Sequence, residues 1–451
     1  MAPSNAKTPI FLTKKEVVLV KPINPTPSEV LSFSTIDNDP HLEILCQTIY
    51  VYRSNTSLSP SQDDPKNTSP DPALVLKQAL SKALVYYHPL AGKLKRQPDG
   101  TLQITCNSDG SFVFDWPSDS DCGYHPLLLQ VTKFSCGGFT IGMGLCHAVC
   151  DGLGAAQFFR AMTELASGKN EPTIKPVWKR ERLVGIVNTD EPFPVPDMNC
   201  FTKSPLLPTS NLYHECFNID ADTIKRIKTR LIENTRDHIA ELKHLIENTT
   251  DQVPEITFTT VEVLTAYVWR SRFRALKQNP DGKTVLHLTV GIRNLVNPPL
   301  PEGYYGNAFV SANIVLSGKD LDKEQLCKIA LLIKNSKKTA SEADYITKAL
   351  NFMEALRRKD MKIDETGASL VVTDWRHLKL VEELDFGWKG CVNMIPIRRR
   401  MLEFVSLCIF LPANMVNLGM EGGIRVLVSL PGGAMDVFKQ EMDALKLGIG
   451  F

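Results

Sequence analysis

A histidine and an aspartate stand four positions apart in the stretch LCHAVCDG, residues 145–152. Cys146 and Cys150 lie next to His147 and Asp151 in the same stretch. Thiolate, imidazole and carboxylate groups all bind metals, and a neutral imidazole also accepts protons near neutral pH. The stretch therefore allows three interpretations: a metal site, a general base, or a histidine buried at the end of a strand.

A metal site is the weakest of these interpretations. Structural zinc sites usually take paired ligands from two segments of the chain, and no matching Cys/His pair occurs elsewhere in the sequence. In a helix, Cys146 and Cys150 would also lie about 100° around the axis from His147 and Asp151. We therefore expect no metal ligand here.

The other two interpretations stay open from the local sequence. The spacing of four positions would place Asp151 on the same helical face as His147, where it could orient the ring as in a catalytic dyad. Glycines at 142 and 144 precede His147, and glycines at 152 and 154 follow it. Glycine permits a ligand to approach closely, but it also occurs for backbone reasons alone.

The neighbouring elements place the stretch at a junction between a strand and a helix. The runs PLLLQVTKF and FTIGMGL flank SCGG at 135–138, which predicts a hairpin with glycines at its turn. Apolar residues then recur with helical spacing over 153–165, and Gly168 closes that helix. Upstream, Asp71 and Pro72 have the residue types of a helix start.

The rest of the chain mixes helices and strands without strict alternation, which predicts an α/β fold with mixed sheets in two lobes. We expect an N-terminal lobe over 1–175, completed by part of 380–410, and a C-terminal lobe over 211–451. The proline-rich residues 176–210 form the crossover linker between them. Further predicted elements are strands at 102–105 and 111–116 and a long helix around 222–247.

Composition describes an ordinary globular chain. Of 451 residues, 22% are charged, and the net charge of +1 gives no polybasic surface for nucleic acid. No apolar block is long enough for a signal peptide or a membrane span. Eleven cysteines without a CxxC spacing favour reduced thiols. We expect a cytoplasmic protein that binds neither nucleic acid nor membrane.

His147 to Gly152 match the HxxxDG signature, and the chain as a whole resembles the plant BAHD acyltransferases. Four further stretches resemble that family's landmarks in the family's order: LSFSTIDND at 31–39, YYHPLAGKLKR at 86–96, YYGNA at 304–308 and DFGWKG at 385–390. Together they cover nearly the whole chain. A kinase interpretation of DFG fails because the sequence has no glycine-rich phosphate loop and no HRD.

The resemblance implies two similarly built lobes, like those of chloramphenicol acetyltransferase, with a channel between them and His147 at its middle. Acyl-CoA would enter as a co-substrate from one side and the acceptor from the other, in a monomer without a permanently bound cofactor. His147 would take the proton of an acceptor hydroxyl or amine as that group attacks the thioester. It also implies that Asp151 pairs with Arg293, and that both support the site with Asp385.

Other site residues follow from the same resemblance. Thr373 and Trp375 match positions that face the reaction centre, where the indole N–H would be a fixed donor to the developing oxyanion; packing in the channel wall is the alternative for Trp375. Thr259 and Thr260 match a segment that meets CoA, and a helix N-cap is their alternative role. Asp374 is either an acceptor-binding carboxylate or a solvated loop residue.

The stretches VWKRERLVG and VGIRNLVNPPLPEGYYGNA resemble the spermidine hydroxycinnamoyl transferases of this family. We therefore expect an aromatic acyl group to be moved to a polyamine, with O-acylation of an alkaloid or terpenoid alcohol as the alternative and a non-catalytic binder as a further one. Two features depart from the family pattern: residues 236–251 look longer than in relatives, and Lys389 stands where DFGWG has its second glycine.

Overall fold

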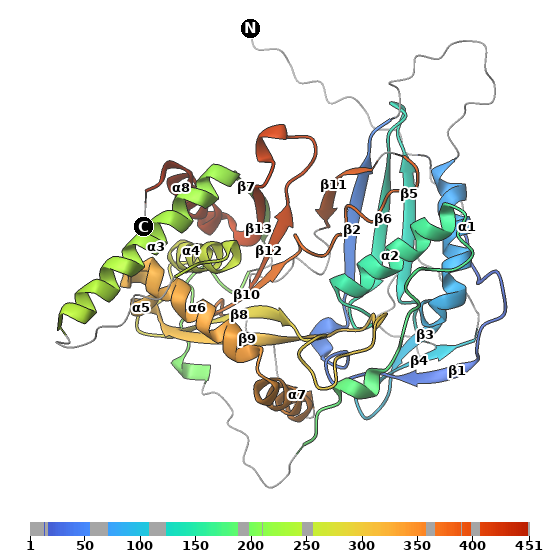
Figure 1. Cartoon of the computed structure of the whole chain (residues 1–451), viewed down its shortest axis with the longest axis horizontal. Coiled ribbons are helices and arrows are strands. Elements are labelled where there is room, and N and C mark those ends of the chain that lie inside the picture. The colour runs from blue at the N-terminus through green and yellow to red at the C-terminus, as the bar shows by residue number, and fades with distance from the viewer. Residues whose placement is uncertain are drawn as a thin grey trace.

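The protein folds into two lobes of sheet and helix that lie side by side (Figure 1). The computed structural model describes residues 13, 17–54, 71–107, 123–187, 198–209, 211–245, 256–357, 366–388, 390–397 and 406–449, without the side chains of 238–245. The predicted strand at 111–116 and Lys389 lie outside these residues, as does the end of the 236–251 segment.

The first lobe is built on a four-stranded antiparallel sheet of order β11-β2-β6-β5. Its strands are β2 (Leu45–Tyr52), β5 (Leu127–Lys133), β6 (Phe139–Cys146) and β11 (Cys391–Pro396). The predicted hairpin is confirmed as β5–β6, and Gly137 at its turn has φ +80°. β11 comes from late in the chain, so the C-terminal part of the sequence completes this sheet.

Helices α1 (Pro72–Tyr86) and α2 (Gly152–Ala166) pack on this sheet, in front of it in Figure 1. Asp71 caps α1 by accepting a hydrogen bond from the Ala73 N–H at 2.9 Å, which confirms the predicted helix start. Phe159 of α2 meets Tyr50 of β2 edge to face at 5.7 Å. A smaller sheet, β1 (Glu29–Ser32), β4 (Leu102–Cys106) and β3 (Lys93–Arg96), lies beside these elements.

The second lobe is built on a six-stranded mixed sheet of order β7-β13-β12-β10-β8-β9. Its strands are β7 (Leu212–Ile219), β8 (Lys283–Gly291), β9 (Phe309–Ser317), β10 (Ser369–Asp374), β12 (Leu407–Pro412) and β13 (Ile424–Pro431). β10 runs parallel to both of its neighbours, and the other pairs are antiparallel.

Helices gather on one side of the six-stranded sheet (Figure 1). They are α3 (Ala221–Leu245), α4 (Thr260–Ala275), α5 (Gly318–Lys323), α6 (Leu326–Ala340) and α8 (Gly432–Leu447), while α7 (Ala343–Arg357) packs near β9. The indole N–H of Trp269 in α4 donates to the Thr284 hydroxyl of β8 at 3.1 Å, which ties this layer to the sheet. Short 3-10 turns complete the chain at Pro40–Leu42, His88–Ala91, Arg180–Leu183, Met198–Cys200 and Leu418–Met420.

The opposite face of the six-stranded sheet turns toward the first lobe. Side chains alternate between the faces of a strand, and Ile409, Leu411 and Leu427 pack into the hydrophobic core of the first lobe. The two cores therefore meet across this face. Strand pairing puts Val371 beside His287 and His287 beside Asn313. Thr373 lies two positions from Val371 in β10, and Phe309 lies four positions from Asn313 in β9. Both side chains are therefore on the face that turns toward the first lobe.

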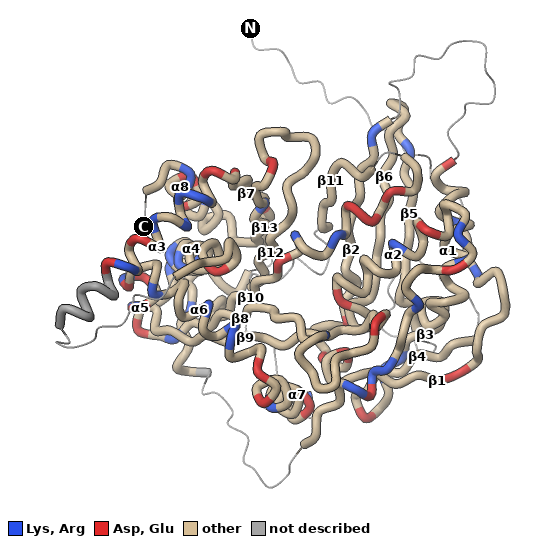
Figure 2. The backbone as a smooth tube through the Cα atoms, in the orientation of Figure 1, with Lys and Arg blue, Asp and Glu red and all other residues tan. Residues whose placement is uncertain are grey.

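Charged residues of both signs are interspersed over both lobes (Figure 2), in keeping with the net charge of +1. In the part of the chain that the structure describes, no helix has both the length and the apolar content needed to cross a membrane.

Candidate active site

His147 lies where the two lobes meet. It directly follows β6, and its backbone N–H donates to the carbonyl of Ile44 at 2.9 Å. The side chain is half-buried, and its ring faces Phe309 at the start of β9 with centroids 6.1 Å apart. The strand end thus presents the imidazole to the second lobe.

Residues 147–149 form a turn, not a helix, and α2 begins at Gly152. The helical spacing that would make His147 and Asp151 a dyad is therefore absent, and that interpretation is wrong. The Nδ1 atom of His147 lies 3.0 Å from Oδ1 of Asn307 instead. Asp151 caps α2 by accepting a hydrogen bond from the Gly154 N–H at 3.0 Å.

The carboxylate of Asp151 points to the second lobe and pairs with Arg293, as the family resemblance implies. Two guanidinium nitrogens donate to its two oxygens at 2.7 and 2.8 Å. Ala308 N–H adds a bond at 3.2 Å, while Arg293 also donates to the Gly306 carbonyl at 2.8 Å. Bidentate, charge-assisted bonds of this kind fix orientation as well as adding energy.

Gly154 is needed for this contact between the lobes. A Cβ at position 154 would lie 1.9 Å from the backbone oxygen of Tyr305, which is far inside van der Waals contact. The first turn of α2 therefore packs directly on the 304–308 segment. Leu378 covers the same turn, since a Cβ at Gly152 would lie 2.3 Å from its Cδ1.

The two cysteines that flank His147 are buried thiols. Burial raises the pKa of the Cys146 thiol far above its usual range, and burial, with a further contribution from Asp151, does the same for the pKa of Cys150. Neither is therefore a thiolate near neutral pH, and the thiolate is the nucleophilic and metal-binding form. Among the residues that the structure describes, no three His, Cys, Asp or Glu side chains gather as a metal site.

Thr373 and Trp375 belong to the second lobe, on the side that faces the first lobe. Thr373 belongs to the sheet face that carries Phe309, whose ring meets His147. Trp375 follows directly, its backbone N–H bound to the Phe410 carbonyl at 2.8 Å, and its side chain packs against the core of the first lobe. The next residues bring Leu378 onto Gly152. Leu378 thus lies against the first turn of α2, while Thr373 lies on the sheet face that carries Phe309.

Asp374 and Asp385 both have local partners. Arg376 donates two hydrogen bonds to the Asp374 carboxylate at 2.8 and 2.6 Å. The charge of Asp374 is thereby compensated, which weakens the prediction that it binds an ammonium group. Asp385 is exposed and accepts the Gly387 N–H at 2.9 Å, so it shapes its own turn.

Thr259 and Thr260 begin α4. Thr259 is the N-cap and forms a capping box with Glu262, so the alternative role of a helix cap applies to it. Lys337 binds the Glu262 carboxylate at 2.8 Å. Burial lowers the pKa of Lys228, and the charge of Arg376 lowers it further. The charge of Glu262 raises the pKa of Lys228, so Lys228 is within reach of both charges. The first turn of α4 therefore holds an ion pair of Glu262 with Lys337, with Lys228 in its surroundings.

The sequence interpretation missed three buried residues around His147. Asn307 contacts the His147 ring, Asp37 contacts Asn307, and Arg180 contacts Asp37. Asn307 and Asp37 lie in the YYGNA and LSFSTIDND stretches, so their motifs marked the regions. Their mutual contacts join residues 270 positions apart, which no local pattern reveals.

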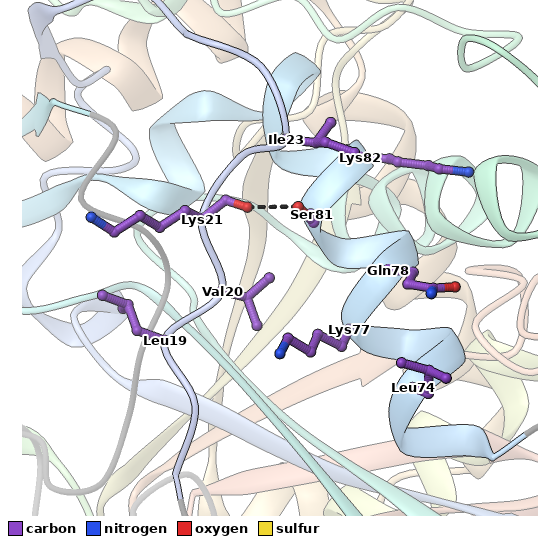
Figure 3. A pocket seen from close by; sticks show the side chains of 9 residues that line it. All are labelled: Leu19, Val20, Lys21, Ile23, Leu74, Lys77, Gln78, Ser81 and Lys82. Carbon is purple, nitrogen blue, oxygen red and sulfur yellow. Dashed lines mark hydrogen bonds between the residues drawn. The ribbon is translucent and has the colours of Figure 1, made fainter.

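A surface groove lies away from these residues, between the extended segment 19–23 and α1 (Figure 3). Ser81 of α1 donates to the Lys21 carbonyl at 2.7 Å across it. None of the site residues above lines this groove, so it is a separate surface feature.

The fold and this site define an acyltransferase with two lobes of the chloramphenicol-acetyltransferase type. Solved structures show the same fold: vinorine synthase has a TM-score of 0.69 at 20% identity, with 96% of this chain and 98% of that chain covered. TRI101 of F. sporotrichioides, complexed with coenzyme A and T-2, has a TM-score of 0.64 at 15% identity, with 92% of this chain and 97% of that chain covered. The protein belongs to the Transferase family, the BAHD acyltransferases, whose model matches residues 10–116 and 112–445.

Curated relatives extend over nearly the whole chain. Spermidine coumaroyl-CoA acyltransferase of Arabidopsis thaliana is 41% identical, over 97% of this chain and 96% of its own. Spermidine sinapoyl-CoA acyltransferase of the same plant is 37% identical, over 97% and 98%. Taxadien-5-alpha-ol O-acetyltransferase of Taxus chinensis is 30% identical, over 97% and 98%.

Proposed function

We propose that the protein moves a hydroxycinnamoyl-type acyl group from CoA to a polyamine such as spermidine, with His147 as general base. The observation that carries this proposal is the half-buried imidazole of His147, held at the meeting of the lobes in a chain 41% and 37% identical to two spermidine acyltransferases. The choice of a polyamine as acceptor rests on the similarity to these two relatives.

In this reaction His147 removes a proton from the acceptor amine while the amine nitrogen attacks the thioester carbonyl carbon. The tetrahedral intermediate collapses, the C–S bond breaks, and the imidazolium returns the proton to the leaving thiolate. General base catalysis by a positioned side chain contributes roughly 10²- to 10⁴-fold. The raised pKa values of Cys146 and Cys150 favour direct attack over an acyl-cysteine intermediate.

Amine acceptors need a proton acceptor in particular. An alkylammonium titrates near ~10.4, so only about one molecule in a few thousand is neutral at pH 7. The site must therefore bind the neutral amine or remove a proton from the ammonium before attack. The carboxylate of Asp374 is compensated by Arg376, so we place no distal ammonium on it.

Two further groups of residues support the substrates in this proposal. Thr373 and the Trp375 indole N–H would donate hydrogen bonds to the oxyanion of the intermediate. Thr259 and Thr260, at the positive end of α4, would meet the CoA moiety, with Lys228 and its basic neighbours near its phosphates. A bound phosphate would also offset the charge of Arg376, which adds to burial in lowering the pKa of Lys228.

O-acylation of a terpenoid or alkaloid alcohol is the second candidate function. It is favoured by the matches to taxane and lupanine acyltransferases, which reach 28–30% identity over similar lengths. The proton chemistry at His147 would be the same for a hydroxyl group. The higher identity to the two spermidine enzymes makes the polyamine the preferred acceptor.

A substrate matrix tests the function. Purified protein is assayed with coumaroyl-, benzoyl- and acetyl-CoA against spermidine and against taxane and quinolizidine alcohols, with free thiol release and product mass as readouts. We expect thiol release with coumaroyl-CoA and spermidine and an N-acyl product. Release with the alcohols alone would favour the second candidate, and binding of coumaroyl-CoA without release in any pair would leave a non-catalytic binder.

We also infer that the protein works as a cytoplasmic monomer and holds no permanent cofactor. Its support is that the contacts joining the two lobes near His147, those of Asn307 with His147 and of Arg293 with Asp151, form within one chain. Light scattering during size-exclusion chromatography should give a mass near 50.2 kDa; a mass twice that value would contradict the monomer.

A further inference from the structure

We propose that Asp37 is a positioning residue that sets the position of the proton on the His147 ring by fixing the orientation of the Asn307 amide. The role in catalysis rests on the proposed function, while the orientation itself is a property of the protein without substrate. Three contacts carry this inference: Asp37 with Arg180, Asp37 with Asn307, and Asn307 with His147.

The first step concerns which way round the Asn307 amide lies. Its Nδ2 is 2.7 Å from Oδ1 of Asp37 and 2.7 Å from the backbone carbonyl oxygen of His147. An ionised carboxylate and a carbonyl only accept hydrogen bonds, so the NH2 group must occupy this side. The side-chain oxygen of Asn307 consequently faces Nδ1 of His147, at 3.0 Å. Asn307 is fully buried, so water does not offer an alternative partner.

The second step concerns what holds the Asp37 carboxylate in place. Arg180 donates to both carboxylate oxygens at 3.1 Å, and the side chains of this pair are 2% and 0% exposed. Ser34 adds its hydroxyl at 2.7 Å and its backbone N–H at 3.1 Å. The Asn307 backbone N–H also donates to Oδ1 at 3.2 Å. With donors on both of its oxygens, the carboxylate is a rigid acceptor for the Asn307 amide.

The third step concerns the imidazole. A neutral histidine carries one ring proton, on either Nδ1 or Nε2, and the hydrogen bond of one nitrogen selects the tautomer. Because the amide oxygen of Asn307 only accepts, Nδ1 must be the protonated nitrogen. Nε2 then keeps its lone pair and is the nitrogen that accepts a proton from the acceptor. A reversed amide would present NH2 to Nδ1 and stabilise the tautomer whose Nε2 cannot accept.

The sequence places these groups far apart, so the arrangement also joins separate segments. Asp37 comes from the start of the chain, Arg180 from the crossover, and Asn307 from the second lobe. The buried pair of Asp37 with Arg180 also stabilises the fold, because removing one partner of such a pair costs roughly 3–5 kcal/mol. Loss of activity in an Asp37 variant could therefore come from lost stability alone. The test must therefore measure the tautomer and the rate as well as the melting temperature.

The main variant is Asp37→Asn, compared with Asn38→Ala in the same turn. Asn38 is buried as well, and it bonds the Ser34 carbonyl and the Leu102 N–H at 2.9 and 2.6 Å. It therefore reports loss of stability in the turn without touching Asn307 or Asp37. Because Asp37→Asn leaves the Arg180 charge uncompensated, the charge-balanced double variant Asp37→Asn/Arg180→Gln serves if the single variant does not fold.

Ring ¹⁵N shifts of histidine-labelled full-length protein without substrate give the tautomer, with His147→Ala assigning the signal. We expect wild type and Asn38→Ala to carry the proton on Nδ1, and Asp37→Asn or the double variant to lose that preference. With coumaroyl-CoA and spermidine, kcat should fall about tenfold or more in the Asp37 variants, with KM for coumaroyl-CoA within about threefold. Asn38→Ala should keep wild-type kcat despite a lower melting temperature.

An Asp37 variant that keeps the Nδ1 proton and wild-type kcat would overturn the inference, as would an Asn38→Ala variant that loses both. The tautomer measurement needs no substrate, so it separates this inference from the proposed function. One outcome would refute the polyamine proposal alone. In it, the wild type does not acylate spermidine, yet it carries the proton on Nδ1 of His147, and the Asp37 variants lose that preference.

Discussion

Arg293 and Asp151 form a bidentate ion pair across 142 positions of sequence, with nitrogen–oxygen distances of 2.7 and 2.8 Å. The carboxylate caps α2 in the first lobe, while the guanidinium holds the Gly306 carbonyl in the second. The pair therefore connects the turn that carries His147 to the segment that carries Asn307. The pair holds the turn of His147 in place.

Removing either partner of this pair should destabilise the protein. In Asp151→Ala or Arg293→Ala the remaining charge is mostly buried, and we expect a loss of roughly 3 kcal/mol in the free energy of unfolding. Thermal melting of both variants and their double checks this, and the double should lose less than the sum of the singles. Lys175→Ala, which breaks an exposed pair with Glu171, is the control and should change the melt little. Lost activity with an unchanged melt in Asp151→Ala would contradict the structural role of this pair.

His147→Ala should abolish turnover and leave the fold intact. The ring is half-buried and its Nδ1 bonds one partner, so its loss leaves few buried groups unsatisfied. We expect thiol release from coumaroyl-CoA with spermidine to fall about 10²- to 10⁴-fold. His41→Ala, which removes a surface histidine whose side chain is 48% exposed, should keep the rate. Near-wild-type turnover in His147→Ala would show that another group is the base.

The cysteines beside His147 should be dispensable for chemistry. Burial raises the pKa of both thiols, so neither supplies a thiolate nucleophile. The Cys146→Ala/Cys150→Ala variant should keep kcat within about threefold of wild type, with some loss of stability from the two small cavities. Intact-protein mass spectrometry of wild type with coumaroyl-CoA alone should show no acyl adduct. An adduct that disappears in the variant would establish an acyl-enzyme.

Gly154→Ala should be strongly destabilising because its new methyl group would meet the Tyr305 backbone oxygen at 1.9 Å. Backbone cannot move aside as a flexible side chain can. Gly433→Ala is the matched control, since it makes the same change in the first turn of α8, where nothing lies within 4 Å of the new Cβ. It should stabilise the protein by up to about 1 kcal/mol, since alanine favours helices over glycine. Equal melting temperatures for the two variants would contradict the packing argument.

Glu262→Gln should weaken the protein in a way that depends on pH. Burial by itself would raise the pKa of Glu262, but Lys337 and the Thr259 N–H lower it below the ordinary value of 4.5. A lowered folded pKa stabilises the fold above pH 4.5, and this contribution is lost as the pH falls through the folded pKa. The melting difference between wild type and variant should therefore be largest near pH 7 and shrink below pH 4.5. Glu171→Gln, in an exposed pair with Lys175, should show a smaller difference.

The secondary structure near the motifs could be predicted because its causes are local. Asp71 followed by proline fixes the start of α1, and the glycines of SCGG permit the turn between β5 and β6. Strand β2 went unrecognised, although it lies inside the first sheet, between β6 and β11. Its side chains are buried or half-buried on both faces, so the clear alternation of apolar and polar residues that marks a half-exposed strand is missing.

The sequence by itself determined which residue is the candidate base and which family supplies its context, because HxxxDG and the other landmarks are contiguous stretches. The family resemblance already implied that Asp151 pairs with Arg293. Only the tertiary structure showed that Arg376 binds the Asp374 carboxylate and that Asn307 contacts the His147 ring. Hydrogen-bond partners depend on which segments the fold brings within about 3 Å, and here those segments are up to 270 residues apart. Spacing in the chain carries no record of such distances.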